Sequence, residues 1–161
     1  MIAIIDTGGA NIASLQIALR RLNAESVLTS DSDLIKKSDR VILPGVGTAQ
    51  ACMKRIDDFN LKNTIRQLTQ PVLGVCLGMQ ILFEYSAEGD TATLGIISGK
   101  VDKIPSQSGF PVPHMGWNNL VLNAPSPLTK DLTAEDYFYF VHSFFAPQVA
   151  NTVAVANYSI P

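Results

Sequence analysis

The most informative stretch of this sequence is Pro71-Val72-Leu73-Gly74-Val75-Cys76-Leu77-Gly78-Met79-Gln80. Residues 71–75 are a short apolar run opened by proline, which predicts a parallel strand covered on both faces. Residues 77–84 predict a helix, so Cys76 stands at a strand-to-helix corner. The backbone at such a corner is cramped, and the glycines two residues before and two residues after Cys76 relieve the crowding.

The pattern Gly74-x-Cys76-x-Gly78 is a cysteine form of the nucleophile elbow, in which a helix N-terminus directs its free N–H groups at the reacting atom. That position favours thiolate over thiol. The N–H of Leu77 is placed to donate to an oxyanion. The alternative is that Cys76 is an inert core cysteine, as most buried free cysteines are. The two glycines and the predicted strand-turn-helix context favour the nucleophile.

The composition predicts one globular domain, since 161 residues with a hydrophobic fraction of 47% can bury a substantial core. A net charge of −2 without a basic run argues against a nucleic-acid partner. The apolar N-terminus ends at Asp6, too early for a signal peptide or a membrane span, which predicts a cytoplasmic protein with no membrane partner. Cys52 and Cys76 lack metal-ligand spacing, so we expect no disulfide, metal or cofactor.

Upstream of the elbow, predicted strands and helices alternate. Apolar runs predict strands at 1–6, 26–29 and 40–43, and helical spacing predicts helices at 11–22, at 31–37 and in two pieces within 48–69. This order predicts an α/β fold, a flavodoxin-like doubly wound and mostly parallel sheet with helices on both faces. Ligands gather at the carboxyl ends of such strands, so we expect the loop at 45–47 and Cys76 on the same rim.

After Ser86 the pattern changes. Residues 95–97 and 100–104 predict short strands, and residues 105–117 are rich in Pro, Gly and Ser, which predicts a loop. Residues 137–142 and 152–158 predict two more strands, as antiparallel neighbours. We expect these strands to extend the same domain.

Five segments together closely resemble the HisH-type glutaminase subunits of imidazole glycerol phosphate synthase, within the class I glutamine amidotransferase family. They are Asp6-Thr7-Gly8-Gly9-Ala10-Asn11, Leu43-Pro44-Gly45-Val46-Gly47, Gly74-Val75-Cys76-Leu77-Gly78-Met79-Gln80, Pro113-His114-Met115-Gly116-Trp117-Asn118 and Tyr139-Phe140-Val141-His142-Ser143. The resemblance implies the class I glutamine amidotransferase fold. It also implies hydrolysis of glutamine to glutamate and ammonia, with the ammonia passed to a (β/α)₈ cyclase subunit for imidazole glycerol phosphate synthesis in histidine biosynthesis.

The resemblance also implies roles for individual residues. Cys76 attacks the side-chain amide of glutamine, and the backbone N–H groups of Val46 and Leu77 form the oxyanion hole. The residues that hold substrate glutamine are Gly45, Gly47, Gln80, His142, Ser143 and Phe144. The residues that meet the cyclase are Asn11, His114, Trp117, Asn118 and Tyr139.

Structural interpretations stay open beside several of these roles. Gly45 and Gly47 could serve only a tight turn, and Gln80 could be a solvated helix residue. With the resemblance set aside, His142 is interpreted as a satisfied core histidine. Trp117 is either an interface anchor or a plug over the core.

One family motif is absent from this sequence. The thiol base of the family is a histidine in a His-Pro-Glu motif after the final strands, whereas residues 1–161 contain only His114 and His142. General acid–base catalysis contributes ~10²–10⁴-fold. We therefore expect residues 1–161 to be a single amidotransferase domain that lacks the usual C-terminal segment and is inactive alone.

Two other classes of function compete with glutamine hydrolysis. One is a cysteine hydrolase or redox thiol protein on a flavodoxin-like fold. The other is a subunit that docks on the cyclase without turning over glutamine.

Overall fold

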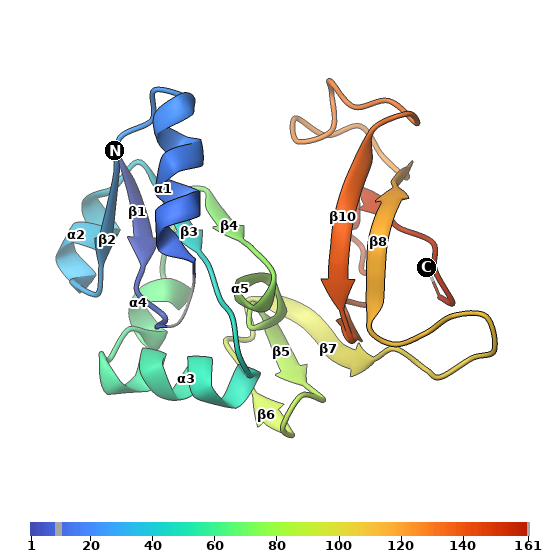
Figure 1. Cartoon of the computed structure of the whole chain (residues 1–161). Coiled ribbons are helices and arrows are strands. Elements are labelled where there is room, and N and C mark those ends of the chain that lie inside the picture. The colour runs from blue at the N-terminus through green and yellow to red at the C-terminus, as the bar shows by residue number, and fades with distance from the viewer. Residues whose placement is uncertain (9–10, 161) are drawn as a thin grey trace. The chain divides into compact units, whose positions relative to one another are not determined.

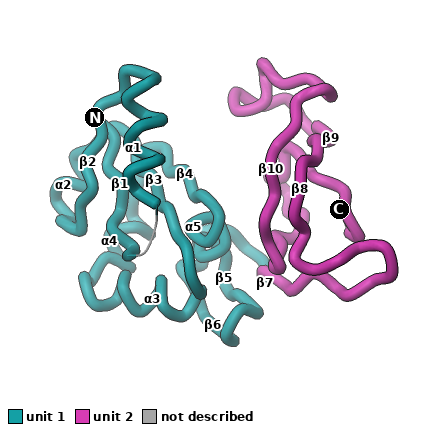
Figure 2. The backbone as a smooth tube through the Cα atoms, viewed as in Figure 1, with its two compact units in different colours: residues 1–100 teal, residues 101–161 magenta. Residues whose placement is uncertain are grey.

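The structure, a computed structural model, describes residues 1–8 and 11–160 and falls into two compact units (Figures 1 and 2). Unit 1 comprises residues 1–100 and unit 2 comprises residues 101–161. The interpretation as a single domain stays a prediction. Gly9 and Ala10 of the first family segment, together with Pro161, lie outside the described residues.

Unit 1 is built on a parallel sheet with the strand order β2-β1-β3-β4. The strands are β1 (Ile2–Ile5), β2 (Ser26–Thr29), β3 (Arg40–Leu43) and β4 (Val72–Gly74). β1 pairs in parallel with both β2 and β3, and β3 pairs in parallel with β4. This is the order of a flavodoxin-like doubly wound sheet, so the predicted fold class is confirmed.

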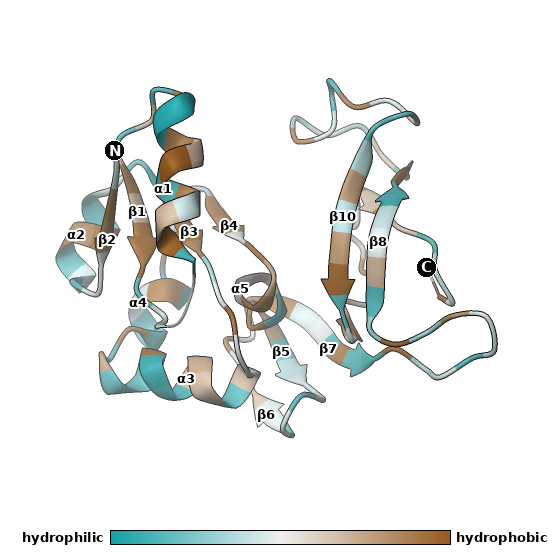
Figure 3. Cartoon of the chain, in the orientation of Figure 1, coloured by the Kyte–Doolittle hydropathy of each residue, from teal (hydrophilic) through white to brown (hydrophobic). Residues whose placement is uncertain are grey.

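Helices cover both faces of this sheet. α1 (Ile12–Arg21) packs through Leu19 on Ile4 and Ile42. The larger core lies on the other face, where the side chains of α2 (Ser32–Lys37), α3 (Ala49–Asp58), α4 (Lys62–Arg66) and α5 (Leu77–Gln80) meet Ala3, Ile5, Val41 and Leu43. The two faces follow from strand geometry, because neighbouring residues of a strand point to opposite sides. Figure 3 shows the hydrophobic β1 beside helices of mixed hydropathy.

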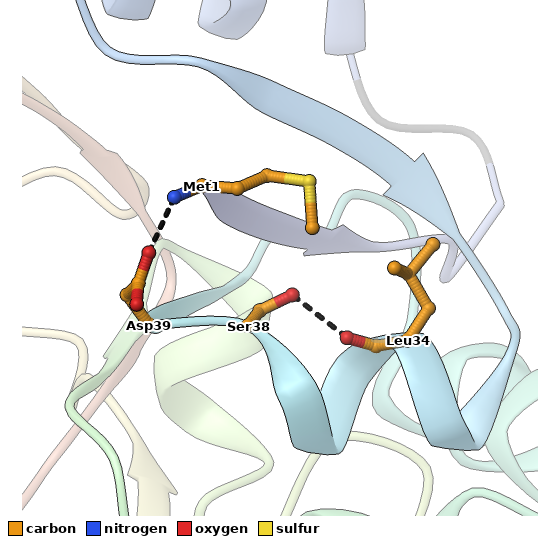
Figure 4. Close-up of polar contacts among 4 residues, drawn as sticks. All are labelled: Met1, Leu34, Ser38 and Asp39. Atoms are coloured by element: carbon orange, nitrogen blue, oxygen red, sulfur yellow. Dashed lines mark hydrogen bonds and ion pairs between the residues drawn. The ribbon is translucent and has the colours of Figure 1, made fainter.

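α1, α2 and α3 each start after a residue whose side chain caps the helix. Asn11 accepts from the N–H of Ser14 at the start of α1, and Asp31 caps α2 through the N–H groups of Asp33 and Leu34. Residues 48–69 form two helices, as predicted. Near the end of α2, the Ser38 hydroxyl donates to the Leu34 carbonyl at 2.8 Å, and the N-terminal ammonium of Met1 pairs with Asp39 (Figure 4).

β4 is partly exposed rather than covered on both faces. The side chain of Leu73 is 51% exposed. Leu73 is the register partner of Ile42 and therefore points to the same face of the sheet, where α1 packs on Ile4 and Ile42. Within the described part of unit 1, β4 pairs only with β3, so it is an edge strand and its outer side chains stay accessible.

α5 ends at Gln80, whereas the sequence predicted a helix over 77–84. The chain turns instead into two short strands that were not predicted, β5 (Phe83–Ser86) and β6 (Thr91–Ala92). The carbonyls of Ile81, Leu82 and Phe83 accept hydrogen bonds from the N–H groups of residues 94–97. Those carbonyls are therefore not available to continue the helix.

Unit 2 consists of antiparallel strand pairs. β8 (His114–Asn119) pairs with β10 (Tyr137–His142), and β9 (Val121–Leu122) pairs with β12 (Ala154–Val155). β11 (Phe144–Phe145) pairs with the last residues of β7 (Ile97–Lys103), a single strand where the sequence predicted two. The predicted pairing of 137–142 with 152–158 is wrong, because β8 is the partner of β10. Residues 114–117 are strand rather than loop, since their backbone groups are paired across this ladder.

Candidate active site

Cys76 occupies the turn between β4 and α5 and is solvent-exposed. Its backbone has φ 56° and ψ −119°, a combination that residues with a side chain rarely adopt. This strained, accessible position is the geometry of a nucleophile elbow. The interpretation as a buried core cysteine is wrong for Cys76. It describes Cys52 instead, which is 3% exposed on α3 and whose thiol pKa burial raises to about 11.

The two glycines of the elbow allow three segments to meet. A Cβ added at Gly78 would lie 1.7 Å from the Leu43 carbonyl oxygen, and one at Gly74 would lie 2.6 Å from the Cα of Met79. No side chain fits at either position. The elbow is thereby held directly against the end of β3.

The loop from Pro44 to Gly47 follows β3 and lies against the elbow. The N–H of Val75 donates to the Leu43 carbonyl at 3.0 Å. A Cβ on Gly45 would lie 2.9 Å from the backbone nitrogen of Gly78. The expectation that this loop and Cys76 share one rim of the sheet is confirmed. Gly47 has φ +93°, and a Cβ there would meet no atom within 4 Å, so this end of the loop is open.

Both predicted oxyanion donors have free N–H groups in the described part of the chain. The N–H groups of Val46 and Leu77 donate to no protein acceptor there. The amides after Leu77 are engaged, since Gly78 donates to the Val75 carbonyl and Met79 and Gln80 donate to the Cys76 carbonyl. The elbow and the neighbouring loop therefore both offer unpaired donors, which is what a developing oxyanion requires.

Gln80 is buried and hydrogen-bonded, so its interpretation as a solvated helix residue is wrong. Its exposed fraction is 8%, and its Nε2 donates to Ser86 Oγ at 2.7 Å and to Glu88 Oε2 at 3.0 Å. A carboxylate only accepts, which fixes the orientation of the amide. The Oε1 of Gln80 is the part of this side chain left free among the described residues.

Glu88 is a site residue that the sequence interpretation missed. Its Oε2 accepts from the Ala49 N–H at 3.0 Å as well as from Gln80, and its own N–H donates to Ser86 Oγ. It thus joins the first residue of α3 to the elbow helix α5. Nothing in the local pattern around Glu88 indicates this role, because its partner Ala49 is 39 positions away in the sequence.

The predicted substrate residues His142, Ser143 and Phe144 belong to unit 2. The Nδ1 of His142 lies 2.9 Å from the Phe144 carbonyl oxygen, and a carbonyl only accepts, so Nδ1 carries the proton. In the neutral ring, Nε2 then accepts from the Nδ1–H of His114 at 3.0 Å. The Ser143 carbonyl accepts from the N–H of Ile104. Both ring nitrogens of His142 are therefore satisfied within unit 2, but the side chain is half-buried, so His142 is not the core histidine of that interpretation.

His114 is 5% exposed and lies between two aromatic rings. Its ring stacks on Tyr158 with centroids 4.0 Å apart and on Phe140 with centroids 5.1 Å apart. Burial, and to a lesser extent the nearby His142, lower the pKa of His114. Both effects favour the neutral ring, which matches the hydrogen bond that it donates to His142.

Trp117 and Tyr139 lie on an exposed face of the β8–β10 ladder. They are cross-strand partners, 69% and 55% exposed respectively, and the next pair on that face, Met115 and Val141, is also exposed. The interpretation of Trp117 as a plug over the core is wrong. A contiguous apolar face of this kind marks interaction surfaces.

The other predicted interface residues have local structural partners. The Nδ2 of Asn118 donates to the Asn157 carbonyl at 2.8 Å. Asn11, in unit 1, is exposed and caps α1. His114 is buried, as described above.

Across residues 1–8 and 11–160, no group of three or more His, Cys, Asp or Glu side chains could hold a metal ion. In the same described part of the chain, no helix is both long enough and apolar enough to cross a membrane.

Comparison with known proteins agrees with this geometry. The family described as glutamine amidotransferase class-I matches residues 3–159. The chain is 46% identical over 158 residues to imidazole glycerol phosphate synthase subunit HisH of Mannheimia succiniciproducens, covering 98% of this chain and 81% of that protein. It is 49% identical over 144 residues to subunit HisH 2 of Legionella pneumophila (strain Paris), covering 89% of this chain and 72% of that protein. A crystal structure of a glutamine amidotransferase superposes with a TM-score of 0.72 at 14% identity, covering 95% of this chain and 78% of that chain, and so supports the fold alone.

Proposed function

Because this chain belongs to the class I glutamine amidotransferase family, and within it to the HisH subunits of imidazole glycerol phosphate synthase, we propose that it hydrolyses glutamine for a cyclase partner. The observation that carries the proposal is the strained and exposed Cys76 at the elbow. The free N–H groups of Val46 and Leu77 support the proposal further, because they can serve as the two donors of an oxyanion hole.

In the proposed reaction the Cys76 thiolate attacks the carboxamide carbon of glutamine. A C–S bond forms, the carbonyl electron pair moves onto oxygen, and the N–H groups of Val46 and Leu77 stabilise that oxyanion. The C–N bond breaks as the nitrogen takes up the proton that the Cys76 thiol lost on ionising, so ammonia leaves and a glutamyl thioester remains. Water then adds to the thioester carbon, and collapse of the second oxyanion releases glutamate and the Cys76 thiol.

The remaining substrate contacts are also proposals. Gly45 and Gly47 border the carboxamide, and Gln80 presents its free Oε1 from the rim of the sheet. In the same proposal, the backbone of His142, Ser143 and Phe144 holds the α-amino and α-carboxylate ends of glutamine. Gln80 is held rigidly by Ser86 and Glu88, which suits a residue that must orient a ligand.

The proposed partner is a (β/α)₈ cyclase subunit that binds as a heterodimer in the cytoplasm and takes up the ammonia directly. The exposed face around Trp117 and Tyr139 is its docking surface, because aromatic side chains dominate the binding energy of interfaces. Asn11 contributes from unit 1. His114 and Asn118 act indirectly, through the contacts that hold β8 in place.

A glutamine-directed covalent inhibitor tests the nucleophile. A diazo-ketone analogue of glutamine should label Cys76 selectively, read by intact mass and peptide mapping, and excess glutamine should protect it. Cys52→Ser should label like the parent, and Cys76→Ala should not label. Absence of a glutamine-protected adduct would contradict the proposal and favour a cysteine hydrolase or a redox thiol protein on the same fold.

A further inference from the structure

We propose that Thr7 and Glu88 are positioning residues that hold the two ends of the loop 44–49 and leave only its centre free to turn. The inference rests on the proposed function, because the group being positioned is the Val46 N–H. Thr7 takes no part in the proposed reaction. Glu88 enters the candidate site only through its hydrogen bonds with Ala49 and Gln80.

The first anchor is Thr7, which follows β1 and is 5% exposed. Its hydroxyl donates to the Pro44 carbonyl at 3.0 Å in a buried position. That carbonyl belongs to the peptide unit joining Pro44 to Gly45, so the hydrogen bond sets the orientation of this unit. A buried carbonyl that loses its donor is costly, which keeps the bond in place. Gly45, at the other end of this peptide unit, packs closely against Leu77 and Gly78, which further restricts the unit.

The second anchor is Glu88, which lies between β5 and β6 and binds the start of α3. Its Oε2 accepts from the Ala49 N–H at 3.0 Å, and the Thr48 hydroxyl accepts from the Ala51 N–H in the same turn. The same Glu88 oxygen also accepts from Gln80 at 3.0 Å. The end of the loop is therefore tied to the elbow helix through one carboxylate oxygen.

Between the anchors, the N–H groups of Val46 and Gly47 find no acceptor among residues 1–8 and 11–160. The space beside Gly47 is empty to 4 Å. The peptide unit of Gly45 and Val46 can therefore rotate while Pro44 and Ala49 stay in place. Because the ends do not move, the anchors determine where the Val46 N–H lies when it points at an oxyanion formed on Cys76.

The test compares Thr7→Val, which removes the hydroxyl at nearly constant volume, with Thr7→Ser, which keeps it. Thr93→Val is the matched control, because Thr93 is 5% exposed and its hydroxyl donates to the Phe83 carbonyl, away from the loop. With the cyclase present, Thr7→Val should lower kcat for glutamine hydrolysis about tenfold and change KM less than about twofold, since a misplaced group affects the reaction more than binding. Thr7→Ser should recover most of the loss, and Thr93→Val should show none.

Two further readouts separate positioning from stability. Alkylation of Cys76 by iodoacetamide forms no oxyanion, so its rate should be equal in all variants. Backbone ¹⁵N relaxation should give order parameters near about 0.85 for Gly45 and Ala49 and below about 0.6 for Val46 and Gly47 in the parent. In Thr7→Val the value for Gly45 should fall to that of Gly47.

An unchanged order parameter of Gly45 in Thr7→Val overturns the inference, and so does an equal loss of kcat in Thr93→Val. Failure of the proposed function looks different. It would appear as ammonia release that persists in Cys76→Ala, and the relaxation data would still decide whether the anchors hold the loop.

Discussion

Trp117 and Tyr139 face each other across the β8–β10 ladder with ring centroids 5.6 Å apart and an interplanar angle of 72°. Both rings stay more than half exposed despite this contact. Edge-to-face aromatic pairs of this kind hold each other in one orientation. The pair is therefore a preformed feature of unit 2 that needs little ordering when a partner binds.

Trp117→Ala should weaken binding of the cyclase by at least about 2 kcal/mol, or roughly 30-fold in Kd, because interface tryptophans are frequent hot spots. Calorimetric titration against the cyclase measures this. Leu128→Ala is the control, since Leu128 is 79% exposed in unit 2 but lies outside this ladder, and it should bind normally. An unchanged affinity of Trp117→Ala would remove this face from the interface.

Gly78→Ala should destabilise unit 1 by more than about 3 kcal/mol, because its Cβ would sit 1.7 Å from the Leu43 carbonyl oxygen and the packed elbow cannot yield. Urea unfolding followed by far-UV circular dichroism gives the change. Gly47→Ala is the comparison. Its φ is +93° with open space around it, so it should lose only about 1–2 kcal/mol. A loss in Gly78→Ala no larger than in Gly47→Ala would show that the packed elbow does yield to the added Cβ.

Glu88→Ala should lower the free energy of unfolding by about 1–2 kcal/mol, since the Ala49 N–H loses its side-chain acceptor and the Gln80 amide loses one of its two acceptors. Chemical denaturation measures the change. Glu25→Ala, at an exposed carboxylate, should stay within about 0.5 kcal/mol of the parent. The same small change at Glu88 would mean that its hydrogen bonds contribute little.

Unit 2 should lose stability as the pH falls below about 6.5. The pKa of His114 is lowered in the folded chain from its ordinary 6.5, first by burial and then by His142. The unfolded chain therefore binds the proton more readily, and the stabilisation present above pH 6.5 is lost as the pH falls toward the folded pKa. Trp117 fluorescence during urea unfolding at pH 7.5 and 5.5 reports this.

His114→Phe keeps an aromatic ring between Phe140 and Tyr158 but cannot titrate, so it should flatten this dependence. The carboxyl pKa values of Asp31, Asp39 and Asp136 are lowered from their ordinary 3.8. These three groups therefore do not contribute to a stability change between pH 7.5 and pH 5.5. A pH dependence that survives in His114→Phe would assign it to another group.

The strands and helices of unit 1 up to the elbow were predictable because each has a local signal. Caps such as Asn11 and Asp31 act within a few residues, and the parallel strands are continuous apolar runs. The early end of α5 was not predictable, because the carbonyls of residues 81–83 are taken by amides from residues 94–97. The pairing of β10 with β8 likewise depends on distant backbone groups, and the strand pattern of 137–142 does not say which segment it will meet.

The chemistry of the elbow follows from residues within a few positions of Cys76. The spacing of Gly74 and Gly78 is enough to predict a strained cysteine at a strand-to-helix turn, because the backbone of such a turn is crowded. The surroundings of Cys76 come from packing instead. The hydrogen bonds of Thr7 with Pro44, of Glu88 with Ala49 and of His114 with His142 all join residues far apart in the sequence. Such contacts exist only once the sheet and its helices have assembled, so no local pattern encodes them.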